Sequence, residues 1–186
     1  LVDAAAEDLT VPNVHLERGA TVVAYSGGKA LCGPQCAGLL LGSKALLMSA
    51  WQASSPHHGT GRDNKVGKEE MLGMLAAIED WVTRDHDEKM RTWHTYLENI
   101  SKKLAGIKGI KTSVREPESL NNRSPVLIVS WDPEQLNITG PDVAEILATT
   151  KPRIAVHSGY GEQDGSTSIR IVAGQMQPGN DKIVAD

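Results

Sequence analysis

Two short apolar runs stand near the start of the chain, separated by a glycine-rich segment. They cover Thr21–Tyr25 and Gly38–Leu41. Unbroken apolar runs of this length are typical of strands that are covered on both faces. Between them, Gly27 and Gly28 allow a sharp turn and the close approach of a bulky group. The pattern predicts two buried strands joined by a turn that presents Lys29.

A short helix is predicted directly after the second strand. Ser43 is a suitable N-cap for a helix over Lys44–Gln52. Leu46, Leu47 and Trp51 would form the buried face of this helix.

A helical period then continues from Lys68 to about Gly106. It predicts one very long helix, or two helices broken near Arg84–Asp87, that bridges two domains. We expect residues 1–84 to be part of a large domain, 85–108 a connecting helix, and 109–186 a small domain. The apolar positions expected in the core are Met71, Leu75, Ile78, Val82, His86, Met90, Trp93, Leu97, Ile100 and Leu104.

The remaining residues alternate between strand-like and turn-like segments. The predicted order of two strands, a helix and two further strands indicates a small α+β domain with an antiparallel sheet. A turn-rich exposed loop is expected over Gly159–Gly165. The predicted elements are strands at Ile110–Val114, Val126–Trp131, Arg153–His157 and Thr167–Val172, and a helix from Gly140 to Thr149.

Composition and charge narrow the class of protein. The chain has 186 residues, 40% of them hydrophobic, and a net charge of -4. No apolar run approaches the roughly 20 residues of a membrane span, and the start lacks the basic region of a secretory signal. A cytoplasmic protein is therefore expected. The mild acidity argues against a large nucleic-acid-binding surface.

Two pairs of residues invite a metal or redox interpretation. Cys32 and Cys36 lack the partners of a four-ligand zinc site, so they are a redox pair or, as we favour, two small buried thiols. His57 and His58 have no third ligand at helical spacing. We therefore expect no metal site in either place.

Lys29 is the main candidate for covalent chemistry. A lysine at the end of a buried strand is driven toward the neutral amine, which is a nucleophile used in Schiff bases. The motif Ser-Gly-Gly-Lys is short and common, so the alternative is that Lys29 is an ordinary surface lysine.

Two other places carry candidate binding residues. Asp3 would lie at the C-terminal edge of a strand, where open α/β sheets bind ligands, or it is a turn aspartate. Thr60 and Arg62, in a polar loop, suit an anion.

The segment YSGGKALCGPQCAGLLLG, followed by GRDNKVGKEEMLGMLAAIEDW, resembles the selenocysteine-synthase-like family of fold-type-I pyridoxal-phosphate-dependent enzymes. That family includes L-seryl-tRNA selenium transferases and D-glucosaminate-6-phosphate ammonia-lyase-like proteins. The resemblance runs from Leu1 to about Asp181. It implies an α/β fold: part of a large domain and a small α+β domain, joined by a long helix. We expect the chain to be the C-terminal portion of a longer protein.

The resemblance also implies roles for individual residues. Lys29 would hold pyridoxal 5'-phosphate covalently, and Asp3 would pair with the pyridine nitrogen. Ser26, and Thr60 from a neighbouring subunit, would bind the phosphate, so a homodimer or higher homo-oligomer is expected. Arg170 would bind the substrate carboxylate, or it is a solvated strand-end arginine.

The implied reaction is α,β-elimination or β-replacement on a small amino acid or amino sugar acid. A seryl-tRNA selenium transferase or an aminotransferase of the same fold is an alternative. An alternative of another class is a non-catalytic fragment or interaction module without cofactor.

Overall fold

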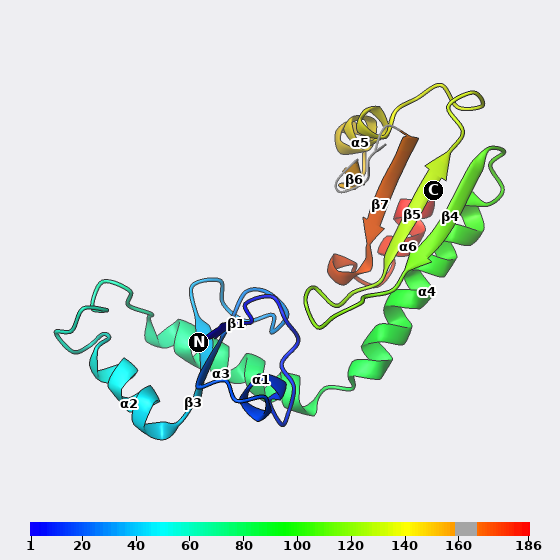
Figure 1. Ribbon diagram of the computed structural model, residues 1–186. Helices are drawn as coiled ribbons and strands as arrows, with labels where there is room; N and C mark the ends of the chain where they lie inside the picture. Colours follow the sequence, from blue (N-terminus) through cyan, green and yellow to red (C-terminus); the bar gives the residue numbers. More distant parts are fainter. Residues whose placement is uncertain (159–166) are drawn as a thin grey trace. The chain divides into compact units, whose positions relative to one another are not determined.

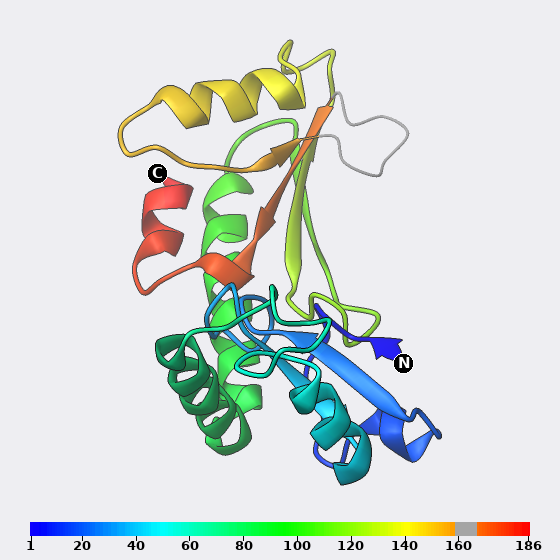
Figure 2. The ribbon, with the colours of Figure 1, turned by 90° about the vertical axis from the view of Figure 1, so that its left-hand side faces the viewer.

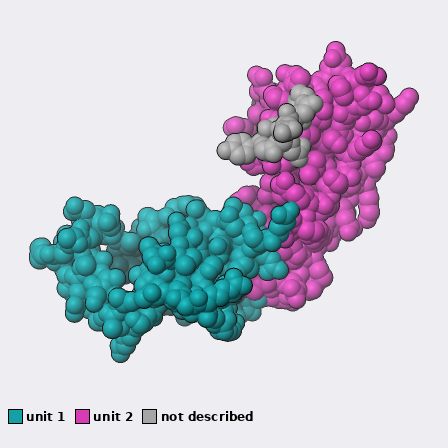
Figure 3. Space-filling view, viewed as in Figure 1, with its two compact units in different colours: residues 1–84, 118–123 teal, residues 85–117, 124–186 magenta. Residues whose placement is uncertain are grey.

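The structure is a computed structural model, and it describes residues 1–158 and 167–186 in two compact units (Figure 3). Unit 1 comprises Leu1–Arg84 and Glu118–Arg123, and unit 2 comprises Asp85–Pro117 and Ser124–Asp186. Each unit combines helices with a sheet (Figure 1), which confirms the predicted α/β class.

The sheet of unit 1 has the strand order β1-β2-β3. Both predicted strands are present, as β2 (Val22–Ser26) and β3 (Gly38–Gly42), and they pair antiparallel. The strand β1 (Val2–Asp3) pairs with β2 in parallel. Because two parallel strands end at the same edge of a sheet, β1 and β2 present their carboxyl ends together.

The core of unit 1 lies between β2 and the helix α3 (Lys68–Thr83). Val23 is buried on β2, and Met74 and Trp81 are buried on α3. The indole Nε1 of Trp81 donates a hydrogen bond of 2.8 Å to the carbonyl oxygen of Leu9. This bond ties α3 to the segment that leads into the short helix α1 (Val14–Glu17).

The burial predicted for α3 is wrong at several positions. Met71, Leu75 and Val82 are 53%, 52% and 55% exposed, whereas Met74 and Trp81 form the inner face. Both sets follow a helical period, so the period alone did not distinguish the inner face from an outer face that is also apolar.

The helix α2 (Lys44–Gln52) has the predicted limits, and the Ser43 hydroxyl accepts the predicted capping bond from the backbone N–H of Leu46. Its predicted buried face is wrong, because no residue of α2 is buried. The expectation that β3 is covered on both faces is also wrong, since none of its residues is buried in this structure.

Unit 2 contains a four-stranded antiparallel sheet with the order β4-β5-β7-β6, as predicted for the α+β part. Its long helix α4 lies along one face of this sheet (Figure 2). The described elements are α4 (His86–Leu104), β4 (Ile110–Arg115), β5 (Val126–Trp131), α5 (Gly140–Thr149), β6 (His157–Ser158), β7 (Ser168–Val172), the 3₁₀ turn η2 (Ala173–Gln175) and α6 (Asn180–Ala185).

The core of unit 2 joins Leu97 and Ile100 of α4 to the inward-facing residues of the sheet. Alternate residues of β5, such as Leu127 and Val129, are buried against α4. Residues of opposite parity, such as Ile128, lie on the other face of the sheet. The sheet therefore has one face that packs against α4 and a second face, formed by the residues of opposite parity, that α4 does not occupy.

Two predictions about element limits are resolved in this part of the chain. The helical pattern is broken into α3 and α4, and the Asp85 carboxylate caps α4 by accepting from the N–H of Glu88. The predicted strand Arg153–His157 is wrong: the strand β6 has only two residues, and the N–H of Ile154 bonds to α5 through the carbonyl oxygen of Leu147. The loop predicted over Gly159–Gly165 lies outside the described residues.

No helix in the described residues is long and apolar enough to cross a membrane.

Candidate functional site

The turn between β2 and β3 is held by its own backbone. The N–H of Gly27 donates to the carbonyl oxygen of Ala37 at 2.9 Å, and the N–H of Gly33 donates to the carbonyl oxygen of Gly27 at 2.7 Å. A Cβ atom at Gly27 would lie only 2.5 Å from the carbonyl oxygen of Pro34. Only glycine therefore fits this turn without moving its backbone.

Lys29 lies in this turn, and its side chain is exposed. The prediction of a buried lysine is wrong, because the residue that enters the core from this turn is Leu31, at 1% exposure. The N–H of Cys32 donates to the carbonyl oxygen of Lys29 at 3.0 Å and fixes the backbone there. The structure therefore presents the lysine at the sheet edge and leaves its amine accessible.

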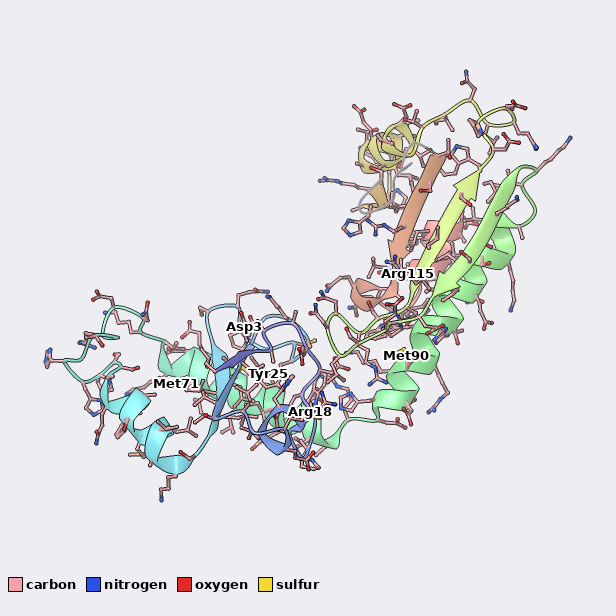
Figure 4. The ribbon with its side chains drawn as sticks, viewed as in Figure 1. Asp3, Arg18, Tyr25, Met71, Met90 and Arg115 are labelled. Carbon is pink, nitrogen blue, oxygen red and sulfur yellow. The ribbon has the colours of Figure 1, made fainter. Side chains whose placement is uncertain are left out.

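Asp3 is at the same edge, because the parallel pair β1–β2 ends there. Asp3 is opposite Ala24, and the N–H of Ser26 bonds to the carbonyl oxygen of Ala5 at 3.3 Å. The Asp3 carboxylate is exposed and accepts a bond of 3.0 Å from the N–H of Ala5 (Figure 4). The backbone register thus brings Asp3, Ser26 and the Lys29 turn to one edge.

Tyr25, the residue before Ser26 on β2, has a buried hydroxyl. The Tyr25 hydroxyl accepts a bond of 2.8 Å from Nδ2 of Asn13, and both residues are buried. Burial raises the pKa of Tyr25 above its ordinary value, and the Glu7 carboxylate raises it further, while the bond from Asn13 lowers it. Tyr25 therefore stays neutral and fixes the end of β2.

Thr60 lies in the loop that follows α2, and its side chain is exposed. The loop is closed by a bond of 2.8 Å from the N–H of Gly61 to the carbonyl oxygen of Ala53. The guanidinium of Arg62 donates to the Ser55 hydroxyl at 2.7 Å. Within residues 1–84, no hydrogen bond or ion pair joins this loop to the Lys29 turn, so the structure does not bring Thr60 together with Lys29.

The histidine pair and the cysteine pair of unit 1 are both in irregular segments between helices and strands. The ring of His57 packs edge-on against Trp51 with centroids 4.5 Å apart. Cys32 and Cys36 are free and exposed, so the expectation of buried thiols is wrong. In the described part of the chain, no group of three or more potential ligands could hold a metal ion.

Arg170 belongs to unit 2, in the middle of β7. It lies on the sheet face that α4 does not occupy, where it lines a cavity of about 300 Å³. Arg115 and His157 line the same cavity. We did not predict these two residues, because only the strand register places them beside Arg170.

The fold of the chain matches that of known proteins. No protein-family model matches the chain. Solved structures that match nearly all of it are fold-type-I pyridoxal-phosphate-dependent enzymes, of which it represents about half. The chain therefore has the fold of the C-terminal part of these enzymes, as predicted from the sequence.

Particular relatives can be named. The chain is 29% identical over 119 residues to D-glucosaminate-6-phosphate ammonia lyase of Salmonella typhimurium (strain 14028s / SGSC 2262), which covers 64% of this chain and 30% of the relative. It is 27% identical over 136 residues to 5'-C-glycyluridine monooxygenase-decarboxylase of a Streptomyces species, covering 73% and 33%. The chain thus spans about a third of the length of the curated relatives it matches.

Two solved structures illustrate the shared fold. A D-glucosaminate-6-phosphate ammonia-lyase has a TM-score of 0.76 and 23% identity, with coverage of 99% of this chain and 46% of that one. An alanine–glyoxylate aminotransferase from Nostoc sp. has a TM-score of 0.55 and 19% identity, with coverage of 100% and 50%.

Proposed function

We propose that the full-length protein is a pyridoxal-phosphate-dependent enzyme of the lyase or transferase type. The observation that carries the proposal is the shared edge of β1 and β2, where Asp3 and the Lys29 turn lie together. An accessible amine and a carboxylate at one sheet edge are the two groups that a pyridine aldehyde needs. Gly27, where a Cβ atom would lie 2.5 Å from the carbonyl oxygen of Pro34, keeps the turn free of a side chain and suits a close approach of the backbone to a ligand.

Each residue has a role in this proposal. Lys29 would hold the cofactor covalently, and its amine would accept the Cα proton of the substrate as general base. Asp3 would pair with the ring nitrogen, and the cofactor would supply an electron sink at Cα. Ser26 binds the phosphate. Arg170 holds the substrate carboxylate through a bidentate pair.

The proposed reaction is α,β-elimination or β-replacement on an amino acid or amino sugar acid. The similarity to an ammonia lyase supports elimination. A net charge of -4 favours a small substrate over a charged tRNA, and thus disfavours the selenium-transfer reaction within the selenocysteine-synthase-like family. We further propose that Thr60 serves the cofactor phosphate of a second subunit, so that the enzyme is at least a dimer.

The test uses the full-length protein incubated with pyridoxal 5'-phosphate. A visible absorbance band that borohydride bleaches is expected, with the reduced adduct on Lys29 by mass spectrometry. Lys29→Ala should remove the band while the unfolding midpoint stays within a few degrees. Lys44→Ala, at the exposed start of α2, is the matched control and should keep the band. An adduct on Lys44 or Lys65 would overturn the assignment.

The substrate side is tested separately. Arg170→Lys should raise KM more than it lowers kcat, because a point charge cannot reproduce the two-pronged contact with a carboxylate. Asp3→Asn should keep the cofactor bound but slow exchange of the substrate Cα proton with deuterium. If no amino acid or amino sugar acid exchanges its Cα proton in the loaded enzyme, the elimination reaction is wrong.

A further inference from the structure

The sheet face of unit 2 that α4 does not occupy carries a cavity with an unusual lining. The cavity has a volume of about 300 Å³ and is lined by Arg115, Val126, His157, Arg170 and Val172. Its walls are thus two valines and three side chains able to carry positive charge. These residues come from all four strands of the sheet.

Strand register fixes how the cationic residues are spaced. Arg115 is opposite Val126, and Val126 is opposite Val172. Arg170, two residues before Val172, is opposite His157. Since directly paired residues and residues two apart share one face, both arginines face the cavity. Two strand spacings and two residues of rise place their Cα atoms about 12 Å apart.

Among residues 1–158 and 167–186, no negatively charged side chain lines the cavity. In the same residues, no ion pair involves Arg115 or Arg170. Glu116, the next residue after Arg115, is directed to another partner: its Oε2 lies 3.3 Å from Nε2 of His94. Two permanently charged guanidinium groups beside one cavity repel each other, and an anionic ligand relieves this repulsion.

We propose that this cavity binds a substrate with two negative groups, one held by Arg170 and the other by Arg115. His157 offers a ring N–H to the same ligand in either tautomer. The role of Arg170 rests on the proposed function, and the inference deepens it by assigning Arg115 and a substrate class. That class is an amino acid whose carboxylate is separated by several bonds from a second anion, a phosphate or another carboxylate.

Direct binding to the full chain, without cofactor, tests the assignment. Isothermal titration would compare 2-aminobutyrate, which has one carboxylate, with 2-aminodicarboxylates of increasing length and with O-phosphoserine. The best dicarboxylate or the phosphate ester is expected to bind at least tenfold more tightly than 2-aminobutyrate. The two kinds of dianion distinguish a second carboxylate from a phosphate.

Variants separate a specific site from general charge. Arg115→Gln should lower the affinity for the dianion about tenfold or more and leave 2-aminobutyrate within twofold, whereas Arg170→Gln should weaken both. Arg115→Lys should recover part of the loss. The matched control is Lys111→Gln, which removes an exposed positive charge from the same strand and face but does not line the cavity.

The inference is overturned if no dianion binds, or if Arg115→Gln weakens the dianion no more than Lys111→Gln does. Both results leave the labelling of Lys29 unaffected. Conversely, the proposed function can fail, with no cofactor adduct on Lys29, while the preference for a dianion and its dependence on Arg115 persist. The two failures are therefore distinguishable.

Discussion

The turn that presents Lys29 depends on Gly27, and replacing this residue with alanine is the sharpest test of the structure. The new Cβ atom would lie 2.5 Å from the carbonyl oxygen of Pro34, 2.7 Å from that of Ala37 and 2.9 Å from the sulfur of Met74. Two of these three atoms belong to the backbone, which cannot move aside without opening the turn. Gly27→Ala should therefore move the turn away from the end of β2.

The magnitude follows from two contributions. Overpacking costs about 1–3 kcal/mol. The displaced turn would also lose two backbone hydrogen bonds, each worth about 1 kcal/mol. They run from the N–H of Gly27 to the carbonyl oxygen of Ala37 and from the N–H of Gly33 to the carbonyl oxygen of Gly27. We expect Gly27→Ala to lower the free energy of unfolding by about 3–5 kcal/mol, the sum of the overpacking cost and the loss of both bonds.

The adjacent glycine supplies the control. A Cβ atom at Gly28 would meet only the side-chain amide of Gln35, the end of an exposed, flexible side chain that can move away. Gly28→Ala should cost about 1 kcal/mol or less, the value of the bond from Gln35 Nε2 to the carbonyl oxygen of Gly28.

Urea unfolding measures both variants, and hydrogen exchange of the β2 and β3 amides shows whether the loss is local to the turn. Equal losses for Gly27→Ala and Gly28→Ala, within 0.5 kcal/mol, would refute this account of the turn.

Three further predictions concern other parts of the molecule. Tyr25→Phe should lower the free energy of unfolding by about 1–3 kcal/mol near pH 7, because it leaves the buried Asn13 amide without its acceptor. Because the pKa of Tyr25 is raised in the folded state, its stabilising contribution is present below about pH 10 and lost as pH rises through the folded value. As the pH is raised above 10, the free energy of unfolding should therefore fall more steeply for the wild type than for Tyr25→Phe. Thr139→Ala should cost about 1 kcal/mol in urea unfolding, since its hydroxyl caps α5 in a capping box. Asn99→Ala should cost about 1–3 kcal/mol, because Asn99 Nδ2 donates to the buried Asp181 carboxylate at 2.7 Å, and a loss no greater than that of an exposed α4 alanine substitution would contradict this.

Local chemistry made several elements predictable from the sequence. The helix Gly140–Thr149 has the predicted limits: Thr139 precedes it and forms a capping box with Asp142, and Pro141 lies in its first turn. The strand predicted over Val126–Trp131 likewise has the limits of β5. In both cases the signal lies within a few residues of the element it defines.

Burial was harder to predict, because it depends on what packs against an element. Both faces of α3 are apolar, so the sequence period fits Met71 as well as Met74, and only the position of β2 selects Met74. Lys29 follows the partly buried strand β2, yet its own side chain is exposed, and Leu31 is the residue of the turn that enters the core.

The candidate site residues of unit 1 were named from local motifs and from the family resemblance. Ser26 and Lys29 share one motif, and Asp3 reaches the same edge through the parallel pairing of β1 with β2. Arg115 and His157 have no such motif. Their place beside Arg170 follows from pairing between strands that are distant in sequence, which local patterns do not specify.

Unit 1 is not a continuous stretch of the polypeptide, since it includes Glu118–Arg123. The N–H of Asp8 bonds to the carbonyl oxygen of Leu120, and the N–H of Asn122 bonds to the carbonyl oxygen of Ala6, each at 2.9 Å. A gene fusion or recombination event with its single junction after Arg84 would separate these partners. An exchange of unit 1 between related proteins must therefore carry the 118–123 segment with it to keep these bonds.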